Sequence, residues 1–174
     1  GGGAARIRLP GDRARAGAVD EARAEGAEQG TIIIGQGMMF EQIEQGLVGL
    51  AKETGARIHV LHVTTREEMD YLRFHKDVAT VEITPQHLTL VGPEAYERLG
   101  SYAQMNPPIR NAPHIEGLWR GVDQGVVDVL GSDHAPHTSE EKARPYPTSP
   151  SGMPGVQMHP NSHLILNSSR VWAC

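Results

Sequence analysis

The fold of this chain is decided by the run Arg57-Ile58-His59-Val60-Leu61-His62-Val63, which has the length and the β-branched content of a buried strand. Two runs of the same kind follow it, Val78 to Ile83 and Val126 to Leu130. Pro85 comes soon after the second run and Gly131 directly after the third, and both residue types are common where a strand stops. The sequence therefore predicts three short buried strands.

Helical patterns separate the predicted strands. Apolar residues near helical spacing predict a first helix over residues 40–50. Thr65 and Glu68 form a capping-box pattern that begins a second helix over residues 66–72. A third helix is predicted over residues 115–122, after a long loop. Strands that alternate with helices are typical of an α/β fold, so we expect parallel strands with flanking helices.

Composition divides the chain into three parts. Residues 1–37 begin with a stretch of mainly Gly, Ala, Arg, Asp and Glu, so we expect a disordered or weakly helical segment there. Residues 38–157 carry the alternating pattern and form the predicted α/β domain. Residues 158–174 mix Asn, Ser and His with a short apolar run, and no element clearly continues the pattern. We therefore expect one domain between two atypical segments.

Charge and composition exclude several classes of protein. The formal net charge of −5 argues against a general nucleic-acid binder, which needs clustered Lys and Arg. No polybasic membrane patch is present, and the apolar runs are far shorter than the ~20 residues that span a bilayer. The N-terminus has no signal-peptide pattern, and a single cysteine, Cys174, excludes an internal disulfide framework. We expect a cytoplasmic protein that binds neither nucleic acid nor membranes.

Two predicted strand ends carry residue types that bind metals. His62 lies near the end of the first strand, and Asp133 closely follows the third. Catalytic groups of parallel α/β folds gather at the carboxyl ends of the strands, and imidazole and carboxylate suit zinc. His59 lies three residues before His62, so the two would point to opposite faces of one strand, and the strand end favours His62. An isolated buried histidine is otherwise an ordinary core residue.

Three loops add candidate site residues. An acid and two histidines lie between Asp133 and His137, and burying them unpaired would be unfavourable, so they are solvated, hydrogen-bonded or metal-bound. Asn106 precedes two prolines that favour an extended backbone, from which its amide can read a polar ring edge. A Gly/Pro loop, Gly152 to Gly155, can offer main-chain groups to a pocket. A purely structural role stays open for the last two loops.

Taken in order, these segments resemble the dihydroorotase branch of the amidohydrolase superfamily. The resemblance covers roughly Leu47 to Gln157. The Asp-His-Ala-Pro-His motif resembles dihydroorotase more than the related hydantoinases and allantoinases, which share the barrel. The matching segments are His59 to Thr65, Glu82 to Leu88, Met105 to Arg110 and Asp133 to His137.

The resemblance implies part of a (β/α)8 barrel of the TIM type, with one or two zinc ions at its C-terminal face. It implies that His62 binds metal, and that Asp133 binds metal and takes a proton from the attacking water. It further implies that Asn106 and His137 bind the ring and the carboxylate of the substrate. The backbone at Pro154 and Gly155 matches another substrate-contacting loop.

Two further residues are candidates on the same basis. Glu82, on the neighbouring strand, is a candidate partner behind the metal ligands or an extra ligand. His87 is a candidate for loop structure or for a place behind the ligands. The implied reaction converts dihydroorotate and water to N-carbamoyl-aspartate in pyrimidine biosynthesis. A divalent metal would activate water and polarise the carbonyl, and Asp133 would carry the proton to the leaving nitrogen.

The chain also departs from the family pattern. It has no His-x-His triplet and no histidine before His59, so the ligands expected on the first and fifth barrel strands have no counterpart. The bridging ligand of the fourth strand has none either. Two protein ligands cannot close a tight zinc site, and a whole barrel needs ~250 residues. We therefore expect a truncated barrel, an incomplete fragment, with residues 1–45 and 158–174 foreign to the family.

Three functions stay open. The first is hydrolysis of a small cyclic amide of the dihydroorotase type, and the second is a hydantoinase- or allantoinase-like activity, because ring specificity depends on few residues. The third is a catalytically inactive scaffold. The expected partners are the small-molecule substrate and either a second copy of the chain or a transcarbamoylase.

Overall fold

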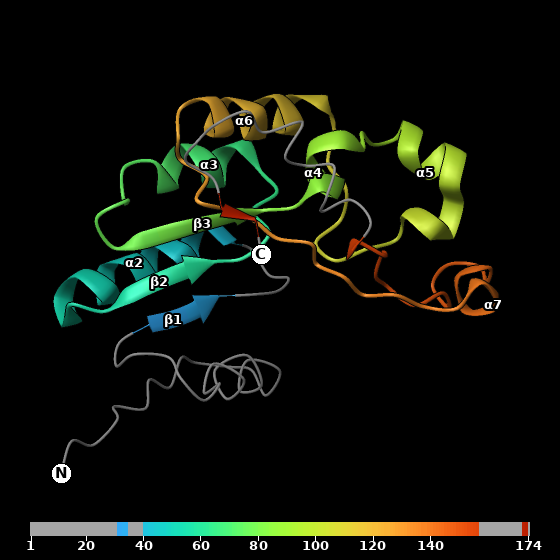
Figure 1. The fold of residues 1–174 in the computed structure, drawn as a ribbon, viewed down its shortest axis with the longest axis horizontal. Coiled ribbons are helices and arrows are strands. Elements are labelled where there is room, and N and C mark those ends of the chain that lie inside the picture. The colour runs from blue at the N-terminus through green and yellow to red at the C-terminus, as the bar shows by residue number, and fades with distance from the viewer. Residues whose placement is uncertain (1–30, 35–39, 157–171, 174) are drawn as a thin grey trace, which may run out of the picture.

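The structure is a computed structural model that describes residues 31–34, 40–156 and 172–173. Its strands form one parallel sheet in chain order, which confirms the predicted α/β fold with parallel strands. In Figure 1 the arrows of the first three strands point the same way, so their carboxyl ends share one edge of the sheet. The strands are β1 (Thr31–Ile34), β2 (Arg57–Val60), β3 (Ala79–Ile83), β4 (Val129–Leu130) and β5 (Trp172–Ala173).

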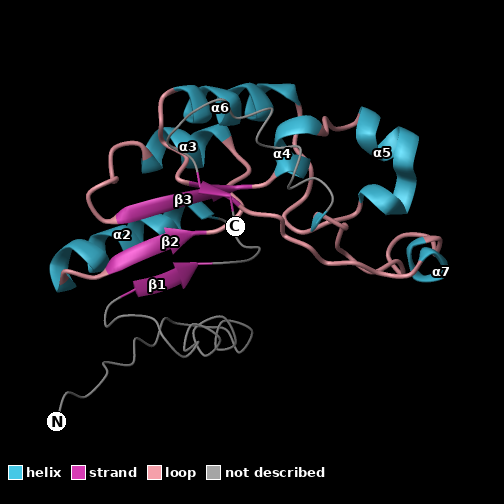
Figure 2. Ribbon diagram, in the orientation of Figure 1, coloured by secondary structure: helices cyan, strands magenta, loops and turns pink. Residues whose placement is uncertain are grey.

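Three helices connect the strands and cover the sheet, namely α2 (Phe40–Thr54), α3 (Arg66–Leu72) and α6 (Ala112–Asp123). Figure 2 shows α3 and α6 running along one side of it. The predicted capping box of α3 is confirmed, because Thr65 Oγ1 accepts a hydrogen bond from Glu68 N and the Glu68 carboxylate accepts one from Thr65 N. The main core lies between strands and helices and includes Val48, Ile58, Leu72, Val81, Ile83, Leu118 and Leu130.

Strand β3 shows how the two faces of the sheet differ. Ala79, Val81 and Ile83 are buried in the main core. Thr80 and Glu82 alternate with them and are only partly buried, so they point to the other face. That face therefore carries polar side chains at the centre of the sheet, whereas the face toward the helices is apolar.

Short helices fill the region between β3 and α6, where the sequence predicted a long loop, so that part of the prediction is wrong. Thr84 caps the first of them, and Pro85 occupies its first turn, where the missing N–H costs no hydrogen bond. Each of these short helices has too few residues for its apolar side chains to show a helical repeat in the sequence. They are α4 (Pro85–Thr89), α5 (Glu94–Leu99) and the 3-10 helix η2 (Gly100–Ala103), and α7 (Ser139–Lys142) lies beside them farther along the chain. No helix in the described ranges is long and apolar enough to cross a membrane.

The remaining differences concern the ends and the last predicted strand. Thr31–Ile34 forms β1, within a segment expected to be disordered or weakly helical, and Trp172–Ala173 forms β5 within the atypical tail. The predictions for residues 1–30 and 157–171 lie outside the described residues. Strand β4 is shorter than predicted because Val126 N donates to the carbonyl of Gly121, which keeps residue 126 bound to the end of α6.

The contact between α3 and α6 requires glycine in α6. A Cβ atom added at Gly117 would lie 2.5 Å from Arg66 Cβ and 2.9 Å from Arg66 Cα. We expect Gly117→Ala to lower the free energy of unfolding by about 1–3 kcal/mol, because the two helices must move apart. At Gly49, in α2, an added Cβ would meet nothing within 4 Å. Gly49→Ala should therefore raise the free energy of unfolding by about 0.5–1 kcal/mol. Urea denaturation of both variants tests this pair, and equal effects would contradict it.

Candidate active site

The two predicted metal-binding residues lie just beyond the carboxyl ends of β2 and β4. His62 is buried and Asp133 is half-buried, and both adopt the left-handed backbone conformation, with φ of 37° and 41°. This conformation is uncommon outside glycine and often marks a functional position. Burial raises the pKa of Asp133, the charge of His62 lowers it and the charge of Glu82 raises it, with a net upward shift. The three side chains are therefore close enough to interact electrostatically.

Glu82 lies between these strand ends. Its Oε1 accepts a hydrogen bond from His62 N at 3.4 Å. Gly131, on the neighbouring chain segment, leaves room for the carboxylate, because an added Cβ at that position would lie 2.5 Å from Oε1. It stays a prediction that Glu82 supports the metal ligands or binds the metal itself. The structure places it beside the main chain of His62 and within electrostatic range of Asp133.

His59 shares the polar face of the sheet with Glu82. Its Nδ1 lies 2.7 Å from Thr80 Oγ1, and its Nε2 lies 3.6 Å from Glu82 Oε2. A continuous strand through His62 would allow only one of His59 and His62 to face the site. Strand β2 ends at Val60, so the alternation of faces does not extend to His62. His59 is thus a site neighbour that the sequence argument set aside, and its register with Thr80 is the signal that identifies it.

His87 is a buried support of the candidate site. Its Nε2 donates a hydrogen bond to the carbonyl of Pro107 at 3.0 Å, which leaves Nδ1 to accept one from Thr84 Oγ1 at 2.7 Å. The ring therefore joins α4 to the loop that carries Asn106. Burial lowers the pKa of His87 to about 4. His87 thus contacts the proline that directly follows Asn106, and its predicted role in loop structure stays a prediction.

The buried His87 should make the stability of the chain depend on pH. Its pKa is about 4 in the folded chain and 6.5 in the unfolded chain, so protons bind the unfolded chain more strongly between these values. The stabilisation from the neutral ring is complete above pH 6.5 and is lost as the pH falls toward 4. It amounts to about 3 kcal/mol. Urea denaturation at pH 7 and pH 4.5 should show this loss, and His87→Gln should remove much of it. His75→Gln, at a half-buried ring, is the matched control.

The predicted substrate-contact residues lie in loops at the same edge of the sheet. Asn106 and His137 are exposed. His137 Nε2 donates to the carbonyl of Ser151 at 3.0 Å, so the loop that follows Asp133 contacts the loop that leads to Pro154 and Gly155. Figure 1 shows α4, α5 and α7 gathered beyond the arrowheads of the strands. The fold thus brings the predicted residues into one region but presents them from separate loops.

Gly155 packs directly on the segment that carries Asp133. An added Cβ at Gly155 would overlap the carbonyl oxygen of Ser132 and would lie 2.9 Å from Gln86 Nε2. Gln86 is buried, and its Nε2 donates to that same carbonyl at 3.0 Å. His134 Nδ1 accepts hydrogen bonds from the main-chain N–H of Gly155 and of the next residue. Sequence reasoning missed Gln86 and His134 as supports, because their partners are main-chain groups of distant segments.

The described residues do not form a complete metal site. Within residues 31–34, 40–156 and 172–173, no three His, Cys, Asp or Glu side chains are arranged to hold one ion. His62 and Asp133 supply two candidate ligands, and a catalytic zinc site takes three from the protein. The ligand set therefore does not fit zinc without contributions from outside these ranges.

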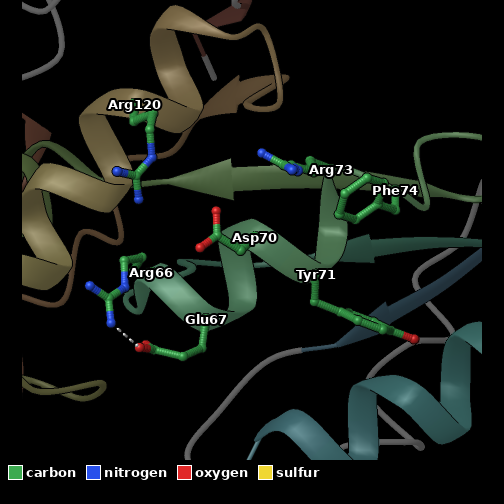
Figure 3. A pocket seen from close by; sticks show the side chains of 7 residues that line it. All are labelled: Arg66, Glu67, Asp70, Tyr71, Arg73, Phe74 and Arg120. Atoms are coloured by element: carbon green, nitrogen blue, oxygen red, sulfur yellow. Dashed lines mark hydrogen bonds and ion pairs between the residues drawn. The ribbon is translucent and has the colours of Figure 1, made fainter.

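A depression on the outer side of α3 and α6 is unrelated to this region. Figure 3 shows the side chains that line it, including the ion pair between Arg66 and Glu67 and the ring of Phe74 beside Arg73. None of the predicted site residues lines it. The strand ends therefore remain the candidate active site.

Comparison with solved structures defines the class of fold. The chain is similar to the L-hydantoinase of Arthrobacter aurescens, with a TM-score of 0.66 and 28% identity over 77% of this chain and 32% of that one. The D-hydantoinase of a Thermus species has the same fold, with a TM-score of 0.58, 24% identity and coverage of 72% and 29%. The predicted partial barrel, with parallel strands and flanking helices, is thereby confirmed.

Comparison with curated proteins is more specific. The chain is homologous to dihydroorotases. It is 40% identical to the dihydroorotase of Lactococcus lactis over 111 residues, which are 62% of this chain and 26% of that protein. It is 42% identical to that of Halobacterium salinarum over 110 residues, 63% of this chain and 25% of that protein. No protein-family model matches the chain. The chain thus spans about a quarter of the length of these relatives.

Proposed function

We propose that this chain is part of a hydrolase of the dihydroorotase type, which opens dihydroorotate with water to give N-carbamoyl-aspartate. The observation that carries the proposal is the grouping of His62, Glu82 and Asp133 at the carboxyl ends of three parallel strands. A second support is the 40% identity of this segment to a dihydroorotase. The compartment proposed with it is the cytoplasm.

Each side chain has a proposed role in that reaction. Asp133 accepts a proton from the attacking water and returns it to the leaving ring nitrogen, and its raised pKa makes it a stronger base. His62 is a metal ligand, and Glu82 holds the main chain of His62 in place. Asn106 and His137 bind the ring and the carboxylate of the substrate, with Pro154 and Gly155 as main-chain contacts. Their positions on separate loops at one edge of the sheet suit this division of roles.

The proposal also concerns zinc. The family chemistry suggests one or two zinc ions, and His62 and Asp133 alone do not close such a site. We therefore propose that the remaining ligands come from outside the described residues, either from the same protein or from a partner chain. Candidate partners are a second copy of the chain and a transcarbamoylase. Sedimentation of the purified chain tests both partners. A dimer of the chain alone would indicate a second copy, and a larger complex formed only in the mixture would indicate a transcarbamoylase.

A segment exchange tests the proposed function. The matching segment of the Lactococcus lactis dihydroorotase is replaced by residues 47–157 of this chain. The exchanged protein should bind zinc and hydrolyse dihydroorotate, because the rest of the relative supplies what the described residues lack. An exchanged protein that folds and binds zinc but turns over no dihydroorotate would count against the proposal, and one that also turns over no other cyclic amide would favour an inactive scaffold.

The likeness to hydantoinases supports a second candidate. The solved structure with the TM-score of 0.66 is an L-hydantoinase, and it is 28% identical to this chain. A cyclic amidase of different ring size is therefore the alternative. Offering the exchanged protein dihydroorotate, hydantoin and allantoin separates the two, because a dihydroorotase-like segment should support turnover of dihydroorotate alone.

A further inference from the structure

Lys142, the last residue of α7, is buried with 5% of its surface exposed. Its ammonium group donates hydrogen bonds to three main-chain carbonyl oxygens, those of Gln104 at 2.9 Å, Pro150 at 2.9 Å and Gly152 at 3.0 Å. An ammonium group has three donors, so each one is used. A buried lysine is rare unless its charge is compensated, and here carbonyl dipoles provide the compensation.

These three carbonyls belong to the loops that carry the candidate substrate contacts. Gln104 precedes Asn106 by two residues, and Gly152 precedes Pro154 by two. The loops also bond to each other directly, because Gly152 N donates to the carbonyl of Gln104 at 3.0 Å. That carbonyl thus accepts from both Gly152 N and Lys142 Nζ. The ammonium group is therefore placed where the two loops meet.

The main chain of Lys142 strengthens the same junction. Its carbonyl accepts hydrogen bonds from the hydroxyl groups of Ser101 and Ser149. Gln104 Nε2 donates to the carbonyl of Ser149 at 3.0 Å. Helix α7 itself begins directly after the loop from Asp133 to His137, with Thr138 as its cap. One residue thus connects the loop before Asn106, the loop before Pro154 and the loop after Asp133.

We infer that Lys142 is a positioning residue, a tethered cation that fixes the two candidate substrate-contact loops against each other and against the loop after Asp133. The contacts of its ammonium group are all hydrogen bonds to main-chain carbonyls, so the effect of the side chain depends on a cation with three N–H donors rather than on apolar volume. The naming of the loops as substrate contacts rests on the proposed function. The junction itself does not.

Substitution with chemical rescue tests the inference. In Lys142→Ala, the amide hydrogens of Gly152 and Ala135, which bond to the carbonyls of Gln104 and Met153, should exchange about tenfold faster or more. Propylammonium chloride replaces the deleted part of the side chain and should restore slow exchange. Tetramethylammonium chloride has the same charge but no N–H donor and should restore nothing. Lys52→Ala, at an exposed lysine, should leave both amides unchanged.

A measurement on the unsubstituted chain keeps the inference testable if Lys142→Ala does not fold. An amine-acetylating reagent should label Lys52 readily and Lys142 at least about tenfold more slowly, because the ammonium group of Lys142 is buried and hydrogen-bonded. Equal labelling of the two lysines would overturn the inference, as would unchanged exchange in Lys142→Ala or equal rescue by both salts. None of these readouts needs turnover, so failure of the proposed function would leave them interpretable.

Discussion

Replacing Asp133 with asparagine in the exchanged dihydroorotase should lower the rate of dihydroorotate hydrolysis by about 10²- to 10⁴-fold. The amide keeps the size of the side chain, but it cannot take a proton from water or return one to the leaving nitrogen. Zinc content should be measured beside the rate, because Asp133 is also a proposed ligand. A loss of rate with zinc retained assigns the proton transfer to this carboxylate.

The matched control is Asp123→Asn, at an exposed carboxylate at the end of α6. It changes the same charge away from the strand ends and should leave the rate within about twofold, since surface substitutions of this kind have small effects. If Asp133→Asn were as active as the control, Asp133 would not be the base and the proposed mechanism would be wrong.

Replacing Gly155 with alanine should lower the rate of the exchanged protein by about 100-fold, although the glycine itself has no side chain that could react. The added Cβ would overlap the carbonyl of Ser132, which is a main-chain atom held by Gln86. Either the loop or the segment that carries Asp133 must then move, and a shift of about 1 Å in a reacting group can cost that factor.

The Gly155→Ala substitution should affect the stability of the folded protein less than its rate of hydrolysis. Overpacking at Gly155 should lower the free energy of unfolding by about 1–3 kcal/mol, measured by urea denaturation. Gly49→Ala, where an added Cβ meets nothing, is the control and should keep the full rate. A Gly155→Ala protein with an unchanged rate would show that the loop moves without disturbing Asp133.

The sequence predicted the features that depend on local pattern. The strand that begins at Arg57 was predicted because its apolar and β-branched residues form a short run, although it ends at Val60 and not at Val63. The start of α3 was predicted because Thr65 and Glu68 need only each other to satisfy the first turn. The sequence motif from Asp133 to His137 indicated the family because its residues are adjacent in the chain.

Features that depend on contacts between distant segments could not be read from the sequence. His59 was set aside because the point where β2 ends is fixed by its pairing with β3, which no local pattern shows. Lys142 reads as a charged residue on a surface helix, and only the folded loops bring three carbonyls to its ammonium group. The short helices α4 and α5 lack the length at which an apolar period becomes visible.

The loops at the strand ends have a small core of their own, which contains Ala95, Ala103, Met105 and Ile109. It is separate from the main core between sheet and helices. Substitutions within this small core can therefore change the shape of the loops without disturbing the packing of the main core. Under the proposed function, this separation would let natural selection, or a protein engineer, alter ring preference at the loops while His62 and Asp133 keep their places at the strand ends.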